Sequence, residues 1–173
     1  MKYQIVIAGF GGQGVVFLVK VLSICAGEKG IAFIGTENHG MSQRGGAVSC
    51  DIKIGDFKNP VIDKNQADLI IGLDKNESLR NLAYLKQDGV VVVNSDDNYP
   101  DVPLKVIKVD VNKKALNGEL PIQGLNVYML GVALKNVENF PFTKDEIKEA
   151  IKKINPKLAE QNFEILEKAI RES

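Results

Sequence analysis

The chain has no tryptophan, one histidine and only two cysteines among its 173 residues. Cys25 and Cys50 cannot complete an iron–sulfur cluster alone, because such a cluster usually needs four thiolates. With a single histidine they also fall short of a zinc site, unless carboxylates or another chain supply ligands. We therefore expect both cysteines to be small buried apolar residues in a reducing compartment.

The chain also lacks an excess of charge, because Lys and Arg total 22 and Asp and Glu total 22. With no net charge, the chain is not drawn over long range to nucleic acid or to an anionic membrane, so neither is expected as a main partner. No apolar run approaches the ~18 residues that span a bilayer, and residues 1–8 are too short for the apolar part of a signal peptide. We expect a cytoplasmic protein that binds neither nucleic acid nor membrane.

The length fits one domain over residues 1–173. Apolar and alternating patterns predict strands at 3–8, 31–34, 48–54, 68–73, 90–93 and 105–109. Helical patterns cover 15–27, 77–85, 123–134, 143–154 and 156 to the C-terminus. This alternation predicts a doubly wound, Rossmann-like α/β sheet with flanking helices and a helical C-terminus. The glycine-rich loop at 35–46 is too short for a helical crossover, so an antiparallel or irregular strand should interrupt a mainly parallel sheet.

A first glycine loop, Gly9-Phe10-Gly11-Gly12-Gln13-Gly14, matches G-x-G-x-x-G between a predicted strand and a predicted helix. The glycines permit a tight turn, and the helix N-terminus near Gly14 offers N–H groups to an anion. A dinucleotide site also needs an acid at the end of the second strand, where Glu37 is slightly late. The Gln13 amide, which suits a ligand or a neighbouring loop, is not part of that pattern. Close packing of helix on sheet is the alternative reason for the glycines.

A second polar loop, residues 36–46, contains the only histidine and an Arg-Gly-Gly sequence. Loops at strand ends hold ligand sites in α/β proteins. Arg44 could form a bidentate pair with a phosphate or carboxylate, although an internal ion pair or an exposed position is the alternative. No catalytic set or metal-ligand spacing accompanies His39, so a structural or interface role is favoured for it. The two loops predict a cofactor-binding set: Gly9, Gly11, Gly12, Gln13, Gly14, Arg44, Gly45 and Gly46.

Both loops in order resemble the small, gamma-type subunit of 2-oxoacid:ferredoxin oxidoreductases. The resemblance covers most of the chain and rests on residues 7–14, 39–48, 67–73, 77–85, 91–94 and 126–131. Within this family, the His39–Gly46 and 77–85 segments look most like the beta subunit of indolepyruvate:ferredoxin oxidoreductase.

The resemblance implies a Rossmann-like fold and a role in oxidative decarboxylation of a 2-oxoacid to an acyl-coenzyme A. It implies thiamine diphosphate, magnesium and iron–sulfur clusters on partner subunits, and ferredoxin as the electron acceptor. It also implies that Gly11, Gly12, Gln13 and Gly14 line the coenzyme A or active-site face, with Arg44 contacting phosphate or the catalytic subunit. Under this interpretation the chain is inactive alone, holds no metal, and could form a homodimer when isolated.

Two other functions stay open at this point. A stand-alone dinucleotide-binding module would bind a nicotinamide or flavin cofactor as an isolated chain. A non-catalytic scaffold would show effects of glycine-loop substitutions on assembly and none on acyl transfer.

Overall fold

The computed structural model describes residues 1–39 and 46–173, and its centre is a mixed six-stranded sheet with the order β2-β3-β1-β4-β5-β6. The strands are β1 (Tyr3–Phe10), β2 (Phe33–His39), β3 (Ala47–Ile54), β4 (Ala67–Gly72), β5 (Leu85–Asn94) and β6 (Lys105–Val109). Strands β1, β4, β5 and β6 pair in parallel, whereas β3 runs antiparallel to both β1 and β2. The predicted mainly parallel sheet with an antiparallel strand is confirmed.

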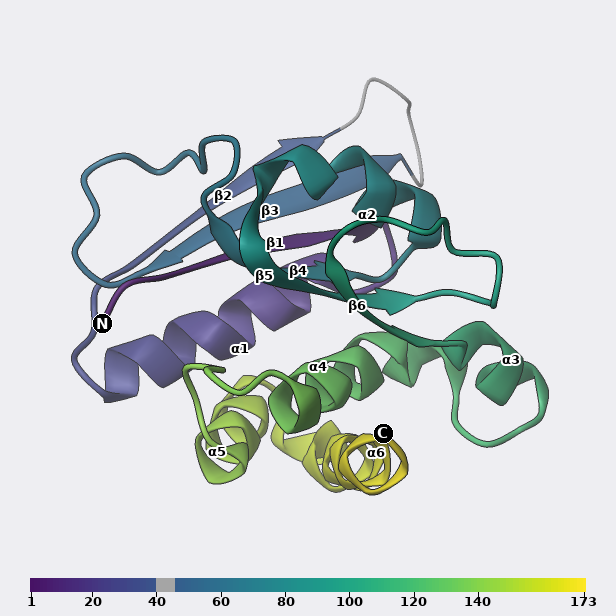
Figure 1. Cartoon of the computed structure of the whole chain (residues 1–173). Helices are drawn as coiled ribbons and strands as arrows, with labels where there is room; N and C mark the ends of the chain where they lie inside the picture. The colour runs from purple at the N-terminus through teal and green to yellow at the C-terminus, as the bar shows by residue number, and fades with distance from the viewer. Residues whose placement is uncertain (40–45) are drawn as a thin grey trace.

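Helices cover both faces of this sheet. They are α1 (Val15–Glu28), α2 (Lys75–Arg80), α3 (Val111–Leu116), α4 (Leu125–Asn136), α5 (Lys144–Ile154) and α6 (Ala159–Glu172), with short 3-10 turns η1 (Leu82–Tyr84), η2 (Ile122–Gly124) and η3 (Pro156–Leu158). Helices α1 and α4 pack on one face and α2 on the other, while α5 and α6 form an outer layer against α1 and α4 (Figure 1). The predicted doubly wound α/β class and helical C-terminus are therefore confirmed.

The core is divided by the sheet. Ile5 and Ile7 of β1 point into the larger cluster, which α1, α4, α5 and α6 cover, and Val6 points into a smaller cluster under α2. This follows from the period of two along a strand. Strand β3 alternates as predicted, but Lys53 is only 6% exposed, because the Phe57 ring covers it with its centroid 5.1 Å from the ammonium nitrogen.

The predicted boundaries of β2, α2 and β5 are wrong, and β5 begins at Leu85, five residues before its predicted start. Strand β2 begins at Phe33 and continues through His39, so residues 35–39 belong to a strand and not to the loop. They pair one by one with β3, and this pairing outweighs the poor strand propensity of glycine, glutamate and asparagine. The helix predicted to Leu85 ends at Arg80 because the next turn is 3-10, and Leu85 already pairs with Ala67 in the sheet.

Helix α3 was not predicted, and the Asp110 side chain caps it by accepting from Lys113 N. A capping box of Thr143 and Glu146 opens α5, which falls within the helix predicted over 143–154. Within the described ranges, no helix is both long and apolar enough to cross a membrane.

Candidate functional site

The carboxyl ends of the four parallel strands meet at one edge of the sheet. The chain leaves β1 toward β2 and β3 on one side, and continues from β4 to β5 and β6 on the other. The direction of strand order therefore reverses between β1 and β4. In open α/β sheets, ligands bind outside the carboxyl ends of the strands at such a reversal. The glycine loop follows β1 at this point.

The glycine loop is a tight turn that the Gln13 side chain closes. Gln13 Oε1 accepts a hydrogen bond of 2.8 Å from Phe10 N, and Gln13 N donates to Phe10 O over 3.1 Å. Gly12 and Gly14 have φ of +91° and +90°, which L side chains rarely adopt. The Gln13 side-chain oxygen thus bonds within its own loop and shapes it.

A buried amide from the first turn of α4 holds the far end of this loop. Asn126 is 6% exposed, and its Nδ2 donates to Gly14 O over 3.2 Å. The contact is so close that a Cβ on Gly14 would lie 2.2 Å from the same nitrogen. Asn126 therefore fixes the start of α1 against α4, across 112 residues of sequence.

The N-terminus of α1 differs from those of its neighbours at the same edge. No side chain among the described residues caps α1, and its first turn contains no acidic residue. Asp74 caps α2 and Asp110 caps α3, each through a carboxylate that accepts a backbone N–H. The α1 terminus combines open N–H groups with the positive end of the helix dipole, so it suits an anionic group.

The second predicted loop ends beside the first. Gly11 N donates to Gly46 O over 3.0 Å, and Phe10 pairs with Ala47 across β1 and β3. His39 pairs with Val48 in the next ladder, so His39 lies at the same sheet edge but two strands from β1. The structure thus brings Gly46 to the glycine loop, whereas the predicted site residues Arg44 and Gly45 lie outside the described residues.

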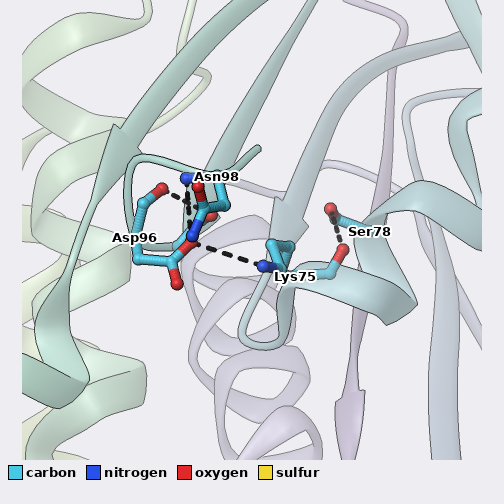
Figure 2. Close-up of polar contacts among 5 residues, drawn as sticks. Lys75, Ser78, Asp96 and Asn98 are labelled. Atoms are coloured by element: carbon cyan, nitrogen blue, oxygen red, sulfur yellow. Dashed lines mark hydrogen bonds and ion pairs between the residues drawn. The ribbon is translucent and has the colours of Figure 1, made fainter. Parts of the chain in front are cut away.

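A polar pocket of about 390 Å³ opens at the carboxyl ends of β4, β5 and β6. Its lining residues are Asp74, Lys75, Asn76, Asn94, Ser95, Asp96, Asp110, Asn112, Lys113 and Leu116. Figure 2 shows one wall, where Lys75 Nζ lies 3.3 Å from Asp96 Oδ1 and Asn98 N donates to the same oxygen over 3.0 Å. These contacts hold the pKa of Asp96 below its usual value, the Asn98 backbone N–H contributing most and Lys75 next.

Comparison with known proteins identifies the family. The family model described as "Pyruvate ferredoxin/flavodoxin oxidoreductase" matches residues 4–172. The chain belongs to this family. A relative from Thermococcus kodakarensis, named indolepyruvate oxidoreductase subunit IorB, is 31% identical over 98% of this chain and 95% of its own length.

Two solved structures share the family fold. The gamma subunit of a keto/oxoacid ferredoxin oxidoreductase from Geobacter sulfurreducens has a TM-score of 0.79 at 21% identity, over 98% of this chain and 96% of its own. The 2-oxoglutarate:ferredoxin oxidoreductase from Magnetococcus marinus, solved with 2-oxoglutarate, coenzyme A and succinyl-CoA bound, has a TM-score of 0.75 at 15% identity. It covers 98% of this chain, which corresponds to 30% of that longer chain.

The family assignment confirms the resemblance drawn from the two loops and disfavours the dinucleotide module. In that module the acid stands on the strand beside β1. Here β3 separates β1 from β2, so Glu37 is two strands, or about 10 Å, from the glycine loop. Glu37 Oε2 instead lies 3.2 Å from His39 Nε2 in an exposed pair.

Both cysteines are buried thiols, as expected. Burial raises the pKa of each to about 12, with Glu146 adding to the rise at Cys25, and Glu37 and Asp51 at Cys50. Residues 1–39 and 46–173 contain no group of three or more metal-ligating side chains.

The polar pocket was not predicted from the sequence. A signal was present, because a polar residue directly follows three predicted strands: Asp74, Asn94 and Asp110. In a parallel sheet such positions meet at one edge.

Proposed function

We propose that the chain is the small, gamma-type subunit of a hetero-oligomeric 2-oxoacid:ferredoxin oxidoreductase and is inactive alone. Membership of the pyruvate ferredoxin/flavodoxin oxidoreductase family over residues 4–172 carries this proposal. The complex would oxidatively decarboxylate a 2-oxoacid, pass electrons to ferredoxin and transfer the acyl group to coenzyme A. The Thermococcus kodakarensis relative favours indolepyruvate as the 2-oxoacid, with pyruvate and 2-oxoglutarate as the other candidates.

The glycine loop would contribute the coenzyme A side of the active site. Coenzyme A would supply the thiol that accepts the acyl group, and its phosphates are anions. The uncapped N-terminus of α1 fits such an anion. A Cβ built on Gly12 meets nothing within 4 Å, so the outer side of the loop is open to a ligand. We propose that Gly11, Gly12 and Gly14 approach the phosphates while Gly9, Gln13 and Gly46 hold the loop.

The sequence alone assigns Arg44 and Gly45 to the same proposed site, and this assignment stays a prediction. A guanidinium can bind phosphate through two parallel hydrogen bonds. Arg44→Ala should therefore raise the KM for coenzyme A or weaken assembly with the catalytic subunit. Unchanged values of both would remove Arg44 from the site.

Thiamine diphosphate, magnesium and the iron–sulfur clusters would lie on partner subunits. Only Cys25 and Cys50 are available in the chain, and both are buried on the α1-facing side of the sheet or in α1 itself. Two thiolates are fewer than a cluster usually needs. A cytoplasmic location belongs to the same proposal.

Purification of the tagged chain under anaerobic conditions tests the proposal. We expect brown partner chains in the eluate, together with dye reduction that depends on both a 2-oxoacid and coenzyme A. Comparison of pyruvate, 2-oxoglutarate and indolepyruvate would name the substrate. A single clean chain carrying a nicotinamide or flavin nucleotide would contradict the proposal.

A further inference from the structure

The sheet ends on one side in β2, whose only neighbour among the described strands is β3. An edge strand exposes backbone groups that can pair with another chain, and proteins usually protect such an edge with lysine, proline or a short length. The opposite edge strand, β6, has five residues and includes Lys105 and Lys108. Strand β2 has seven residues and contains neither lysine nor proline. The β2 edge therefore lacks the usual protection against pairing.

The ladder between β2 and β3 shows which backbone groups of β2 face outward. Gly55 N donates to Ala32 O over 2.8 Å, and this pair continues the register in which Phe33 lies opposite Ile54. Hydrogen-bonded and non-hydrogen-bonded pairs alternate along an antiparallel ladder, so every second residue of β2, counted from Ala32, bonds to β3. The N–H and C=O groups that point away from the sheet belong to the other residues: Phe33, Gly35, Glu37 and His39.

These four residues are complementary to themselves in an antiparallel pair about a twofold axis at Thr36. Phe33 would lie opposite His39 of the second copy, and Gly35 would lie opposite Glu37. All four outward-facing residues of each copy would then form hydrogen-bonded pairs. A shift of the axis by one residue in either direction would lose one of these pairs, and a shift to Glu37 would also set the two Glu37 side chains directly opposite each other. Like charges in that position destabilise a sheet, so the register centred on Thr36 is favoured.

The side chains fit this register. Thr36 would meet Thr36 of the second copy, which is a favourable cross-strand pair. Phe33 is only half-buried in the single chain and would be covered by His39 of the second copy. Glu37 would face a glycine, and its Oε2 already lies 3.2 Å from Nε2 of its own His39.

The helices leave room for the contact. Helix α1 packs over β3 and over the strands on either side of it. The β3 strands of two joined copies would be separated by three inter-strand spacings, or about 14 Å. Packed helices need only about 8–10 Å between their axes, so the two α1 helices would not collide.

We propose that the β2 edge is the contact between two copies of this chain, which join their sheets through an antiparallel β2 pair centred on Thr36. Strand β2 runs parallel to β1, because both are antiparallel to β3. The twofold axis therefore places the two glycine loops at opposite edges of the joined sheet. This inference does not depend on the reaction or on its substrate.

Disulfide cross-linking of the full chain tests the register. Residues opposite each other in a non-hydrogen-bonded pair lie about 4.5 Å apart at Cα, which is within the range of a disulfide. Thr36→Cys should therefore give a covalent dimer on a non-reducing gel after treatment with the oxidant diamide. Asn38→Cys is the matched control, because this residue lies on the same face of β2 but would be four residues, or about 14 Å, along the strand from its counterpart. Cys25 and Cys50 are buried and present in both variants.

Sedimentation velocity tests the backbone pairing. Glu37→Pro removes one outward N–H from each copy and leaves the bonds to β3 in place. It should raise the dissociation constant of the dimer at least about tenfold, since two hydrogen bonds are lost. Glu37→Gln keeps that N–H and should leave the constant nearly unchanged.

Cross-linking at Asn38→Cys equal to that at Thr36→Cys, or at neither position, would overturn the inference. Equal dissociation constants for Glu37→Pro and Glu37→Gln would do the same, and the cross-linking pair decides alone if Glu37→Pro fails to fold. These outcomes leave the proposed function in place, because 2-oxoacid-dependent activity of the whole complex tests that function separately.

Discussion

Two side-chain amides hold the glycine loop, and they lie 113 positions apart in the sequence, at Gln13 and Asn126. Gln13 closes the turn from within, and Asn126 reaches Gly14 from α4. The position of Gln13 inside the glycine motif already indicated from the sequence that its amide has a role in the loop. The sequence could not indicate the contact of the second amide, because a hydrogen bond across 112 residues depends on how α1 and α4 pack.

Loss of the Asn126 amide should loosen the loop. We expect Asn126→Ala to lower the free energy of unfolding by about 1–2 kcal/mol, because Gly14 O loses its donor in a buried place. The KM for coenzyme A should also rise in the whole complex. Asn136→Ala is the control, because Asn136 lies on the same helix and donates to Val132 O instead. Equal KM values in the two variants would leave Asn126 with a purely structural role.

Replacement of a packed loop glycine by alanine should lower stability more than the same replacement at a glycine with no neighbouring atoms. Gly14→Ala should lower the free energy of unfolding by about 2–3 kcal/mol, because alanine is strained at a positive φ and its methyl group would overlap Asn126. Gly30→Ala, with φ of +66° and no neighbouring atom within 4 Å, should cost only about 1 kcal/mol. Urea unfolding of the two variants measures the difference, and equal costs would contradict the packing described for Gly14.

The two thiols predict how stability depends on pH. Burial raises their pKa from 9.0 to about 12, so the folded chain holds these protons more tightly than the unfolded chain. Their contribution is complete below pH 9 and falls as the pH rises toward 12. The loss is at most about 1.4 kcal/mol per thiol for each pH unit. Urea unfolding between pH 8 and pH 10 should show a steeper fall for the wild type than for the Cys25→Ala, Cys50→Ala double variant; parallel curves would contradict this.

At the scale of elements, patterns that are local in sequence were predictable. The alternation in β3, the apolar run in β5 and the capping box of α5 each require only neighbouring residues. Strand β2 was predicted too short, because Thr36, Glu37 and Asn38 enter the sheet only through pairing with β3. Helix α3 was missed because its six residues form less than two turns and present too little periodicity.

The contact between α4 and α6 gives a prediction at this scale. A Cβ on Gly131 would lie 2.6 Å from Ala169 Cβ and 3.0 Å from Leu166 O, so the helices approach each other at this glycine. Gly131→Ala should lower the free energy of unfolding by about 1–3 kcal/mol. Gly27→Ala in α1, where nothing lies within 4 Å, should raise it by up to about 1 kcal/mol through helix propensity. Two changes of the same sign would contradict this account of the interface.

At the scale of the whole molecule, the fold class and the position of the glycine loop followed from sequence, because both depend on strand–helix alternation and a known edge of the sheet. The meeting of the two loops at Gly11 and Gly46 did not, since it requires β3 to turn back along β1. The polar pocket likewise needs three strand ends in register, so the polar residues that follow β4, β5 and β6 point to it only once the strand order is known.

Reconstitution of the complex tests the central claim most directly. The partner chains are purified anaerobically with and without this chain, and 2-oxoacid-dependent dye reduction is measured with and without coenzyme A. We predict turnover that depends on coenzyme A only when this chain is present, and its loss when the chain is omitted. Equal activity without the chain would contradict its role as a subunit of a 2-oxoacid:ferredoxin oxidoreductase.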